Sequence, residues 1–290
     1  MINLSRFIKR FWKIMLVALM ATAALCIVFD AFLWEPETFE VNAHTVYLKN
    51  WHKEHNGMRV AVLSDIHQLN TPHDYARLDR IIQATNDQKP DLILLLGDFL
   101  GGTMDWKRMN AQPRQIASCL KKLSAKHGVY AVLGNHDWWL DGQGIRDALL
   151  AVGIRVLENQ VETLLIDSKP LNIIGLPDAG TRQHLFDRDA LPDESIPALV
   201  MAHDPDSFSN LDLPYELTLS GHTHGGQVQL PIMGAVTSYS PLLSAYVEGM
   251  YEKSGRRLFV TRGLGTSLMK VRFRCLPEIV ILTLYRQPEQ

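Results

Sequence analysis

The chain has 290 residues, and its 29 lysines and arginines nearly balance its 31 acidic residues. This balance argues against a protein that coats nucleic acid through bulk charge, so no nucleic-acid partner is expected. Three cysteines without a C-x-x-C pair do not form a disulfide scaffold.

The N-terminal segment is basic at first and then apolar. Four cations lie between residues 6 and 13, and residues 14–34 are predominantly apolar, interrupted by Asp30. As a helix this run would be about 31 Å long, close to the thickness of one hydrocarbon core. Apolar residues continue beyond the small residues at 21–24, which favours an uncleaved membrane anchor over a cleaved signal peptide.

The charges on the two sides of this segment predict its orientation. Cations precede it, whereas four acidic residues between 30 and 40 interrupt or follow it. The excess of basic residues places the N-terminus in the cytoplasm, so in a bacterium the chain would be a single-pass inner-membrane protein with its main domain in the periplasm. The alternative is a helix in the interface plane with the domain on the cytoplasmic face. Trp12 and Trp34, near the two ends, favour spanning.

The rest of the chain divides into a linker and one large domain. With residues 1–34 as the anchor, residues 35–57 are expected to form an acidic linker and a first strand, and residues 58–290 a single domain. No low-complexity tract or repeat interrupts this last part. We therefore expect one folded unit behind the anchor.

Apolar runs alternate with amphipathic helices in the first half of the domain. The expected strands are 59–64, 91–96 and 129–133. The expected helices begin near Pro72 and Pro113, and a third one ends at Gly153. Continuous apolar runs of this kind are typical of strands that are covered on both faces.

The second half of the domain has more strands and fewer helices. The expected strands are 161–166, 171–174, 198–201, 217–220, 258–260 and 279–284. Together the two halves predict an α/β fold with two sheets packed as a sandwich. Ligand sites in such folds lie at the carboxyl ends of the strands.

Five polar clusters follow the expected strands in chain order. They are Ser64-Asp65-Ile66-His67, Leu96-Gly97-Asp98, Gly134-Asn135-His136-Asp137, Ala202-His203 and Gly221-His222-Thr223-His224. They offer carboxylates, one amide and several imidazoles but no thiolate, a set that suits two divalent ions such as Mn²⁺, Fe or Zn²⁺. If the clusters converge in space, the chain is a two-metal hydrolase.

The order and content of these clusters resemble the calcineurin-like metallophosphoesterase signature, from residue 59 to about residue 284. Gly225-Gly226-Gln227 and the segment 261–267 resemble the membrane-associated bacterial branch of YaeI- and YkuE-like phosphodiesterases, which is related to hydrolases of UDP-2,3-diacylglucosamine. The resemblance implies an αββα metallophosphoesterase sandwich that hydrolyses phosphoric esters. Gln68-Leu69 departs from the family, which often has a glycine there.

The resemblance also implies a role for each cluster. One metal would be held by Asp65, His67 and His224, the other by Asn135, His203 and His222, with Asp98 bridging them. His136 would remain free as the catalytic imidazole near the leaving oxygen. The two cations would generate a metal-bound hydroxide and clamp the phosphoryl oxygens. Asp137 either orients the His136 imidazole or has a simple surface or capping role.

Three features bear on the substrate. Trp138 and Trp139 either form an apolar wall for acyl chains, together with Trp106 in the loop after Asp98, or pack the third helix. The apolar segment 230–250 either covers the site or contacts lipid. Arg262 either binds a phosphate or belongs to a solvated basic cluster at 262–274.

These features favour a phosphodiesterase or pyrophosphatase for an amphiphilic, lipid-linked substrate such as UDP-2,3-diacylglucosamine or a related phospholipid. One alternative is a general phosphodiesterase or phosphomonoesterase for soluble substrates. Another is an inactive metal-binding scaffold, which is disfavoured because every expected ligand position is filled. The predicted orientation conflicts with a UDP-linked substrate, because such precursors are expected on the cytoplasmic face.

Overall fold

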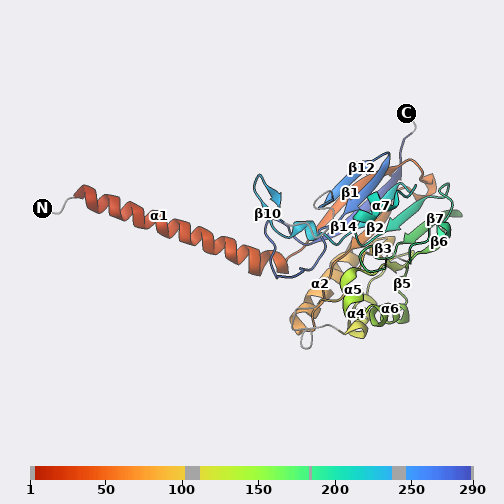
Figure 1. Cartoon of the computed structure of the whole chain (residues 1–290), viewed down its shortest axis with the longest axis horizontal. Helices are drawn as coiled ribbons and strands as arrows, with labels where there is room; N and C mark the ends of the chain where they lie inside the picture. The colour runs from red at the N-terminus through yellow and green to blue at the C-terminus, as the bar shows by residue number, and fades with distance from the viewer. Residues whose placement is uncertain (1–3, 102–111, 183–184, 237–245, 289–290) are drawn as a thin grey trace.

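The computed structural model describes residues 4–101, 112–182, 185–236 and 246–288. Figure 1 shows a body of strands and short helices from which one long helix extends. Within the described residues, two six-stranded sheets form the centre of this body. The expected α/β fold with two sheets is therefore confirmed.

The first sheet has the strand order β1-β14-β2-β3-β4-β5. Its strands are β1 (Glu40–Leu48), β14 (Glu278–Arg286), β2 (Met58–Leu63), β3 (Leu92–Leu95), β4 (Val129–Ala131) and β5 (Arg155–Val156). β14 is antiparallel to β2, and the other neighbours are parallel. The first strand expected within residues 35–57 is thus β1, which pairs with the last strand of the chain.

The second sheet has the order β12-β13-β9-β8-β7-β6. Its strands are β12 (Gly249–Lys253), β13 (Arg256–Val260), β9 (Leu217–Ser220), β8 (Ala198–Met201), β7 (Lys169–Gly175) and β6 (Gln160–Ile166). The four central strands are parallel, and an antiparallel strand closes each edge. All six strands expected in the second half exist, but the last one, β14, belongs to the first sheet.

Helices cover the outer face of the first sheet. They are α2 (Pro72–Asp87), α4 (Pro113–Leu120), α5 (Asn135–Leu140) and α6 (Gly142–Ala151). Alternate residues of β2 face opposite ways: Leu63 packs with these helices, whereas Val62 packs with residues of the second sheet. A further helix, α7 (Asp206–Leu211), follows β8. α2 and α4 begin at the two expected prolines. Proline fits the first position of a helix because the N–H group there has no partner within the helix.

The long helix that leaves the body is α1 (Leu4–Phe29), which continues through two short helical turns, Asp30–Trp34 and Glu35–Glu37. The stretch Ile8–Glu37 is long and apolar enough to cross a membrane. Its side chains are almost all exposed up to Phe29, and Figure 1 shows the helix extending away from the sheets. The expected apolar helix is therefore present, and the described part of the body leaves it largely uncovered.

The loop between β13 and β14 is organised around a buried arginine. Arg272 is fully buried, and its guanidinium donates to the carbonyl oxygens of Gly265, Arg262 and Cys275 at 2.6, 2.8 and 3.1 Å. A planar fork of N–H donors can satisfy several carbonyls of one loop at once. Arg272 thus holds residues 262–275 in one conformation over the carboxyl ends of the strands.

Candidate metal centre

The five polar clusters lie at one edge of the two sheets. Asp65 and His67 follow β2, Asp98 follows β3, and Asn135 follows β4 as the first residue of α5. The remaining imidazoles follow β8 and β9 of the second sheet: His203, His222 and His224. Parallel strands bring their carboxyl ends to the same edge, so residues far apart in the chain meet there.

One group of side chains gathers around Asp65. The Nε2 atoms of His67 and His224 lie 3.2 Å apart, and His224 Nε2 lies 3.5 Å from Asp65 Oδ1. All three side chains are buried, and their ligand atoms lie within 4.8 Å of one another. This spacing is suitable for a single metal ion.

A second group gathers around Asp98. The Nε2 atom of His203 lies 3.3 Å from Asp98 Oδ2 and 3.1 Å from the amide oxygen of Asn135. His222 Nδ1 lies 3.1 Å from His203 Nε2. The same Asp98 oxygen lies 3.5 Å from His67 Nε2, so Asp98 stands between the two groups.

Close packing and unusual backbone conformations shape the site. A Cβ atom on Gly134 would collide with Asp98 and His203, so only glycine fits there. Five of the seven candidate ligands have a positive φ: Asp65, His67, Asp98, His222 and His224. Such residues are uncommon outside glycine and cluster at functional sites, where the surrounding structure holds the strain. The donor set and its crowding fit two cations bound side by side.

Burial and charge set the protonation of these groups in opposite directions. Burial lowers the pKa of His67 to about 3 and the pKa of His224 well below its ordinary value. Burial also lowers the pKa of His203, but the Asp98 and Asp65 carboxylates outweigh it and raise that pKa well above the ordinary value. For His67 and His224 the lowered pKa favours the neutral imidazole, the form in which histidine binds metals.

Asp137 supports the loop that carries Asp98. Its fully buried carboxylate accepts hydrogen bonds from the backbone N–H groups of Asp98, Phe99, Leu100 and Gly134, at 2.9 to 3.0 Å. Four donors from two loops therefore converge on one side chain at the start of α5. Of the two roles left open for Asp137, this geometry supports capping. Asp137 also binds the N–H groups of the loop after β3, a contact that the sequence pattern does not predict.

His136 lies at the rim of the two groups. Its backbone N–H donates to Asp98 Oδ1 at 2.9 Å, and its ring lies 4.7 Å from that of His67. Nε2 lies 3.4 Å from the Ser267 hydroxyl. Burial lowers the pKa of His136, although Asp98 opposes this shift. Ser267, which lies on the loop held by Arg272, is a site residue that sequence reasoning did not single out.

The two adjacent tryptophans have different environments. Trp138 is partly buried in the helix layer, with its ring against Gly142 and 4.2 Å from the Arg182 guanidinium. Trp139 is 66% exposed, and its ring lies 4.9 Å from that of His136. The expected packing role therefore fits Trp138, and the apolar side chain beside the candidate catalytic histidine is Trp139.

The expected phosphate contact of Arg262 has strong competitors. Its guanidinium pairs with Glu278 at 2.8 Å, with Glu248 at 3.6 Å and with Glu40. Burial lowers the pKa of Arg262, but these carboxylates outweigh it and raise the pKa above the ordinary value. Arg262 thus joins β1, β14 and the β13–β14 loop, which is a structural role.

Two expected features fall partly outside the described residues. Trp106 and its neighbours lie in the part of the chain that the structure does not describe, as do residues 237–245 of the apolar segment 230–250. The described start of that segment forms a hairpin, β10 (Gln229–Leu230) and β11 (Gly234–Ala235).

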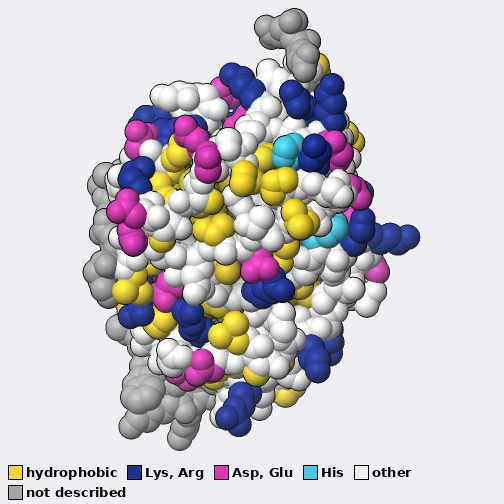
Figure 2. All heavy atoms as spheres, turned by 90° about the vertical axis from the view of Figure 1, so that its right-hand side faces the viewer, with side chains coloured by type: hydrophobic (Ala, Val, Ile, Leu, Met, Phe, Trp, Pro, Cys, Tyr) yellow, Lys and Arg dark blue, Asp and Glu magenta, His cyan; other side chains and the backbone are white. Residues whose placement is uncertain are grey.

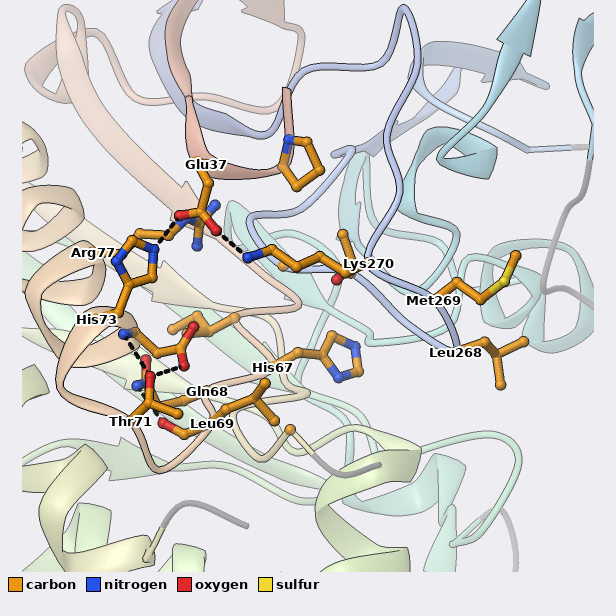
Figure 3. A pocket seen from close by; sticks show the side chains of 16 residues that line it. Glu37, His67, Gln68, Leu69, Thr71, His73, Arg77, Leu268, Met269 and Lys270 are labelled. Carbon is orange, nitrogen blue, oxygen red and sulfur yellow. Dashed lines mark hydrogen bonds and ion pairs between the residues drawn. The ribbon is translucent and has the colours of Figure 1, made fainter. Parts of the chain in front are cut away.

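A cavity of about 350 Å³ adjoins the metal centre at His67. It is bounded by Pro36 and Glu37 at the end of the anchor, by the start of α2, and by Leu268 and Met269 of the β13–β14 loop. Figure 3 shows Glu37 bridging His73 and Lys270 across it, with His67 nearby. The cavity thus connects a candidate metal ligand with the end of the apolar stretch Ile8–Glu37.

The chain matches the model of the calcineurin-like phosphoesterase family over residues 58–226, more than half of its length. It therefore belongs to this family of phosphoric ester hydrolases, whose members use a dinuclear divalent metal centre. The described residues supply candidate ligand clusters for such a centre.

Three relatives place the chain within the family. It is 33% identical to the uncharacterized metallophosphoesterase YkuE of Bacillus subtilis, over 86% of this chain and 87% of that protein. It is 34% identical to the phosphodiesterase YaeI of Escherichia coli, over 68% and 72% of the two chains. It is 25% identical to the UDP-2,3-diacylglucosamine pyrophosphatase LpxG of Chlamydia trachomatis, over 80% and 85%. The expected branch is confirmed.

Replacing Asp137 by alanine should destabilise the fold and weaken metal binding. Four buried N–H groups lose their acceptor. We expect this loss to lower the free energy of unfolding by about 3 kcal/mol and the thermal midpoint by roughly 6 to 12 °C. Displacement of Asp98 should lower metal affinity roughly tenfold or more. Thermal unfolding and a competitive chelator titration measure the two effects. The control is Asp147→Ala at an exposed position of α6, and equal midpoints for both variants would contradict the role given to Asp137.

Proposed function

We propose that this chain is a metal-dependent phosphodiesterase or pyrophosphatase that acts on a lipid-linked phosphate ester, such as UDP-2,3-diacylglucosamine or a related phospholipid. The observation that carries the proposal is the convergence of two ligand groups on Asp98, at one sheet edge beside a cavity. A soluble phosphate ester is the alternative substrate.

The residues divide naturally between two divalent ions. Asp65, His67 and His224 would hold one ion, and Asn135, His203 and His222 the other, with Asp98 shared. Carboxylate, amide and imidazole donors suit Mn²⁺, Fe or Zn²⁺. When bound, the two cations neutralise the phosphoryl oxygens and lower the pKa of coordinated water. The buried protein groups fix the positions of these charges before substrate arrives.

His136 is the proposed proton donor to the leaving oxygen. It lies at the rim of the site, beside the candidate ligand His67, and its ring reaches the Ser267 hydroxyl. A protonated imidazole at this position can donate its proton to the leaving oxygen as the ester bond breaks. The Ser267 hydroxyl would orient the ring.

Three observations favour an amphiphilic substrate. The exposed ring of Trp139 lies beside His136, where it can contact an acyl chain. The cavity joins His67 to the residues that follow α1. One relative is named for the hydrolysis of UDP-2,3-diacylglucosamine, a lipid-linked pyrophosphate. Together these observations support a substrate that has an apolar part as well as a phosphate ester.

The proposed location is the inner membrane, with α1 as a single span and the body in the periplasm. This orientation rests on the four cations before the span. A body on the cytoplasmic face is the alternative, and a UDP-linked lipid would be found there.

A topology reporter tests this orientation. Alkaline phosphatase fused after Gln290 should be active, and a green fluorescent protein at the same position should stay dark, because α1 carries the C-terminus across the membrane. As a matched control, replacing the four N-terminal cations by glutamine should weaken or reverse the preference. The opposite reporter pattern in the unaltered chain would place the body in the cytoplasm.

Metal removal and substrate comparison test the activity. Hydrolysis of bis-p-nitrophenyl phosphate should be lost after treatment with a chelator and restored by Mn²⁺, Fe²⁺ or Zn²⁺, because the ligand groups act only through cations. A diacylated pyrophosphate in mixed micelles should give a kcat/KM at least about tenfold higher than its deacylated form. Equal values would support the soluble alternative, and no metal-stimulated hydrolysis of either ester would refute the proposal.

Replacing His136 by alanine should separate catalysis from metal binding. Turnover should fall at least about tenfold through loss of the proton donor, whereas metal content measured by atomic emission should stay near normal. His44→Ala, at an exposed histidine on β1, is the control and should keep full turnover. Unchanged turnover would remove His136 from the mechanism, and loss of one metal equivalent would make it a ligand instead.

A further inference from the structure

The end of the membrane segment is fastened to the loop that covers the metal centre. Ala31 and Glu35 are buried against the body. The backbone N–H of Arg272 donates to the Ala31 carbonyl at 2.9 Å, and the Glu35 carboxylate accepts from the N–H groups of Arg274 and Cys275 at 2.7 and 3.1 Å. α1 therefore has a defined direction relative to the body.

The same loop binds the β10–β11 hairpin. The N–H of Phe273 donates to the Gln227 carbonyl at 2.8 Å, and the N–H of Gln229 donates to the Phe273 carbonyl at 2.9 Å. Figure 1 shows the hairpin projecting from the body on the side from which α1 leaves. Hydrogen bonds thus join the end of the anchor, the β13–β14 loop and the hairpin into one unit.

Two turns of this unit present apolar side chains to the outside. Ile232 and Met233 at the hairpin tip are 106% and 78% exposed, and Leu268 and Met269 in the loop are 85% and 65% exposed. We call these four residues the apolar rim. Large, strongly exposed apolar side chains on two turns of one hydrogen-bonded unit are candidates for an interaction site.

The backbone of the rim strengthens this interpretation. Ile232 has a φ of 73° and Leu268 a φ of 62°. A branched or bulky residue in this region is strained, and a glycine would relieve the strain at once. The turns therefore carry large apolar side chains at positions where stability of the body alone would favour glycine.

The opposite face of the body has a different character. Figure 2, which views the side away from α1, shows basic and acidic side chains interspersed with scattered apolar ones. Leu165 on β6 is 76% exposed. Isolated exposed residues of this kind are common on soluble surfaces.

Two residues of the rim also line the cavity beside the metal centre. Leu268 and Met269 line this cavity together with His67, and Pro36 and Glu37 at the end of the anchor close its other side. Figure 3 shows Leu268 and Met269 at one end and Glu37 at the other, with His67 between them. The cavity therefore opens between the anchor and the rim.

We propose that the apolar rim inserts into the headgroup region of the bilayer that holds α1, so that the cavity beside His67 opens at the lipid surface. This inference rests on the proposed membrane anchor and extends the proposed function. A lipid-linked ester then reaches the centre with its acyl chains still in the membrane, and only its phosphorylated part enters the cavity.

Depth probing tests insertion without any activity measurement. The full chain with Cys26→Ser and Cys119→Ser is reconstituted in vesicles of phosphatidylethanolamine and phosphatidylglycerol, and an environment-sensitive fluorophore is attached at Met233→Cys. Its emission should shift to shorter wavelength and be quenched by brominated lipids. The same label at Leu165→Cys, a matched exposed position, should behave as in water. A water-like signal at position 233 in vesicles that retain the chain after carbonate washing would overturn the proposal.

Charged substitutions at the hairpin tip give a second, kinetic readout. In the double variant Ile232→Asp and Met233→Asp, hydrolysis of a diacylated pyrophosphate embedded in these vesicles should fall roughly tenfold, whereas hydrolysis of bis-p-nitrophenyl phosphate should stay unchanged. Leu165→Asp should alter neither rate. An equal fall for both substrates, or for neither, counts against insertion. A parent chain inactive on both substrates would refute the proposed function, while the depth probe still decides the position of the rim.

Discussion

The structure depends on holding two buried carboxylates and a set of imidazoles at one sheet edge. Asp65 and Asp98 are 0% and 1% exposed, and burial of such groups is unfavourable unless opposite charge lies beside them. The backbone of five candidate ligands is also in the left-handed region, at a cost of about 1 kcal/mol or more each. Such unfavourable terms are expected at a functional site whose geometry is fixed before its ligands bind.

Residues outside the set of candidate ligands hold the ligand loops in place. Asp137 gathers four N–H groups from two loops, and Arg272 gathers carbonyls from a third. Glu35 fastens that third loop to the end of the anchor. The loop that places Ser267 beside His136 is therefore also the loop that fixes the direction of α1. One set of buried hydrogen bonds serves both the site and its placement relative to α1.

Sequence reasoning reaches the elements whose cause is local. Apolar periodicity and the prolines at positions 72 and 113 are sufficient to predict strands and helix starts, and the shared edge of parallel strands predicts that the clusters meet. The pairing of Arg262 with three carboxylates, the burial of Arg272 and the contrast between Trp138 and Trp139 could not be predicted. The two arginine environments depend on tertiary partners far along the chain. The contrast between the tryptophans depends on which side of a short helix faces the core.

In the proposed membrane arrangement, the attachment of α1 to the body would limit which phosphate esters the site can reach. Pro36 and Glu37 end the apolar stretch Ile8–Glu37 and line the cavity, so in that arrangement the candidate ligand His67 would lie close to the level at which the chain leaves the bilayer. A phosphoryl group held at headgroup depth, as in the proposed substrate, would lie within reach of such a site. The side of the membrane changes which lipids are present, but not this depth. The proposed substrate class therefore depends on the junction between α1 and the body more than on the orientation of α1.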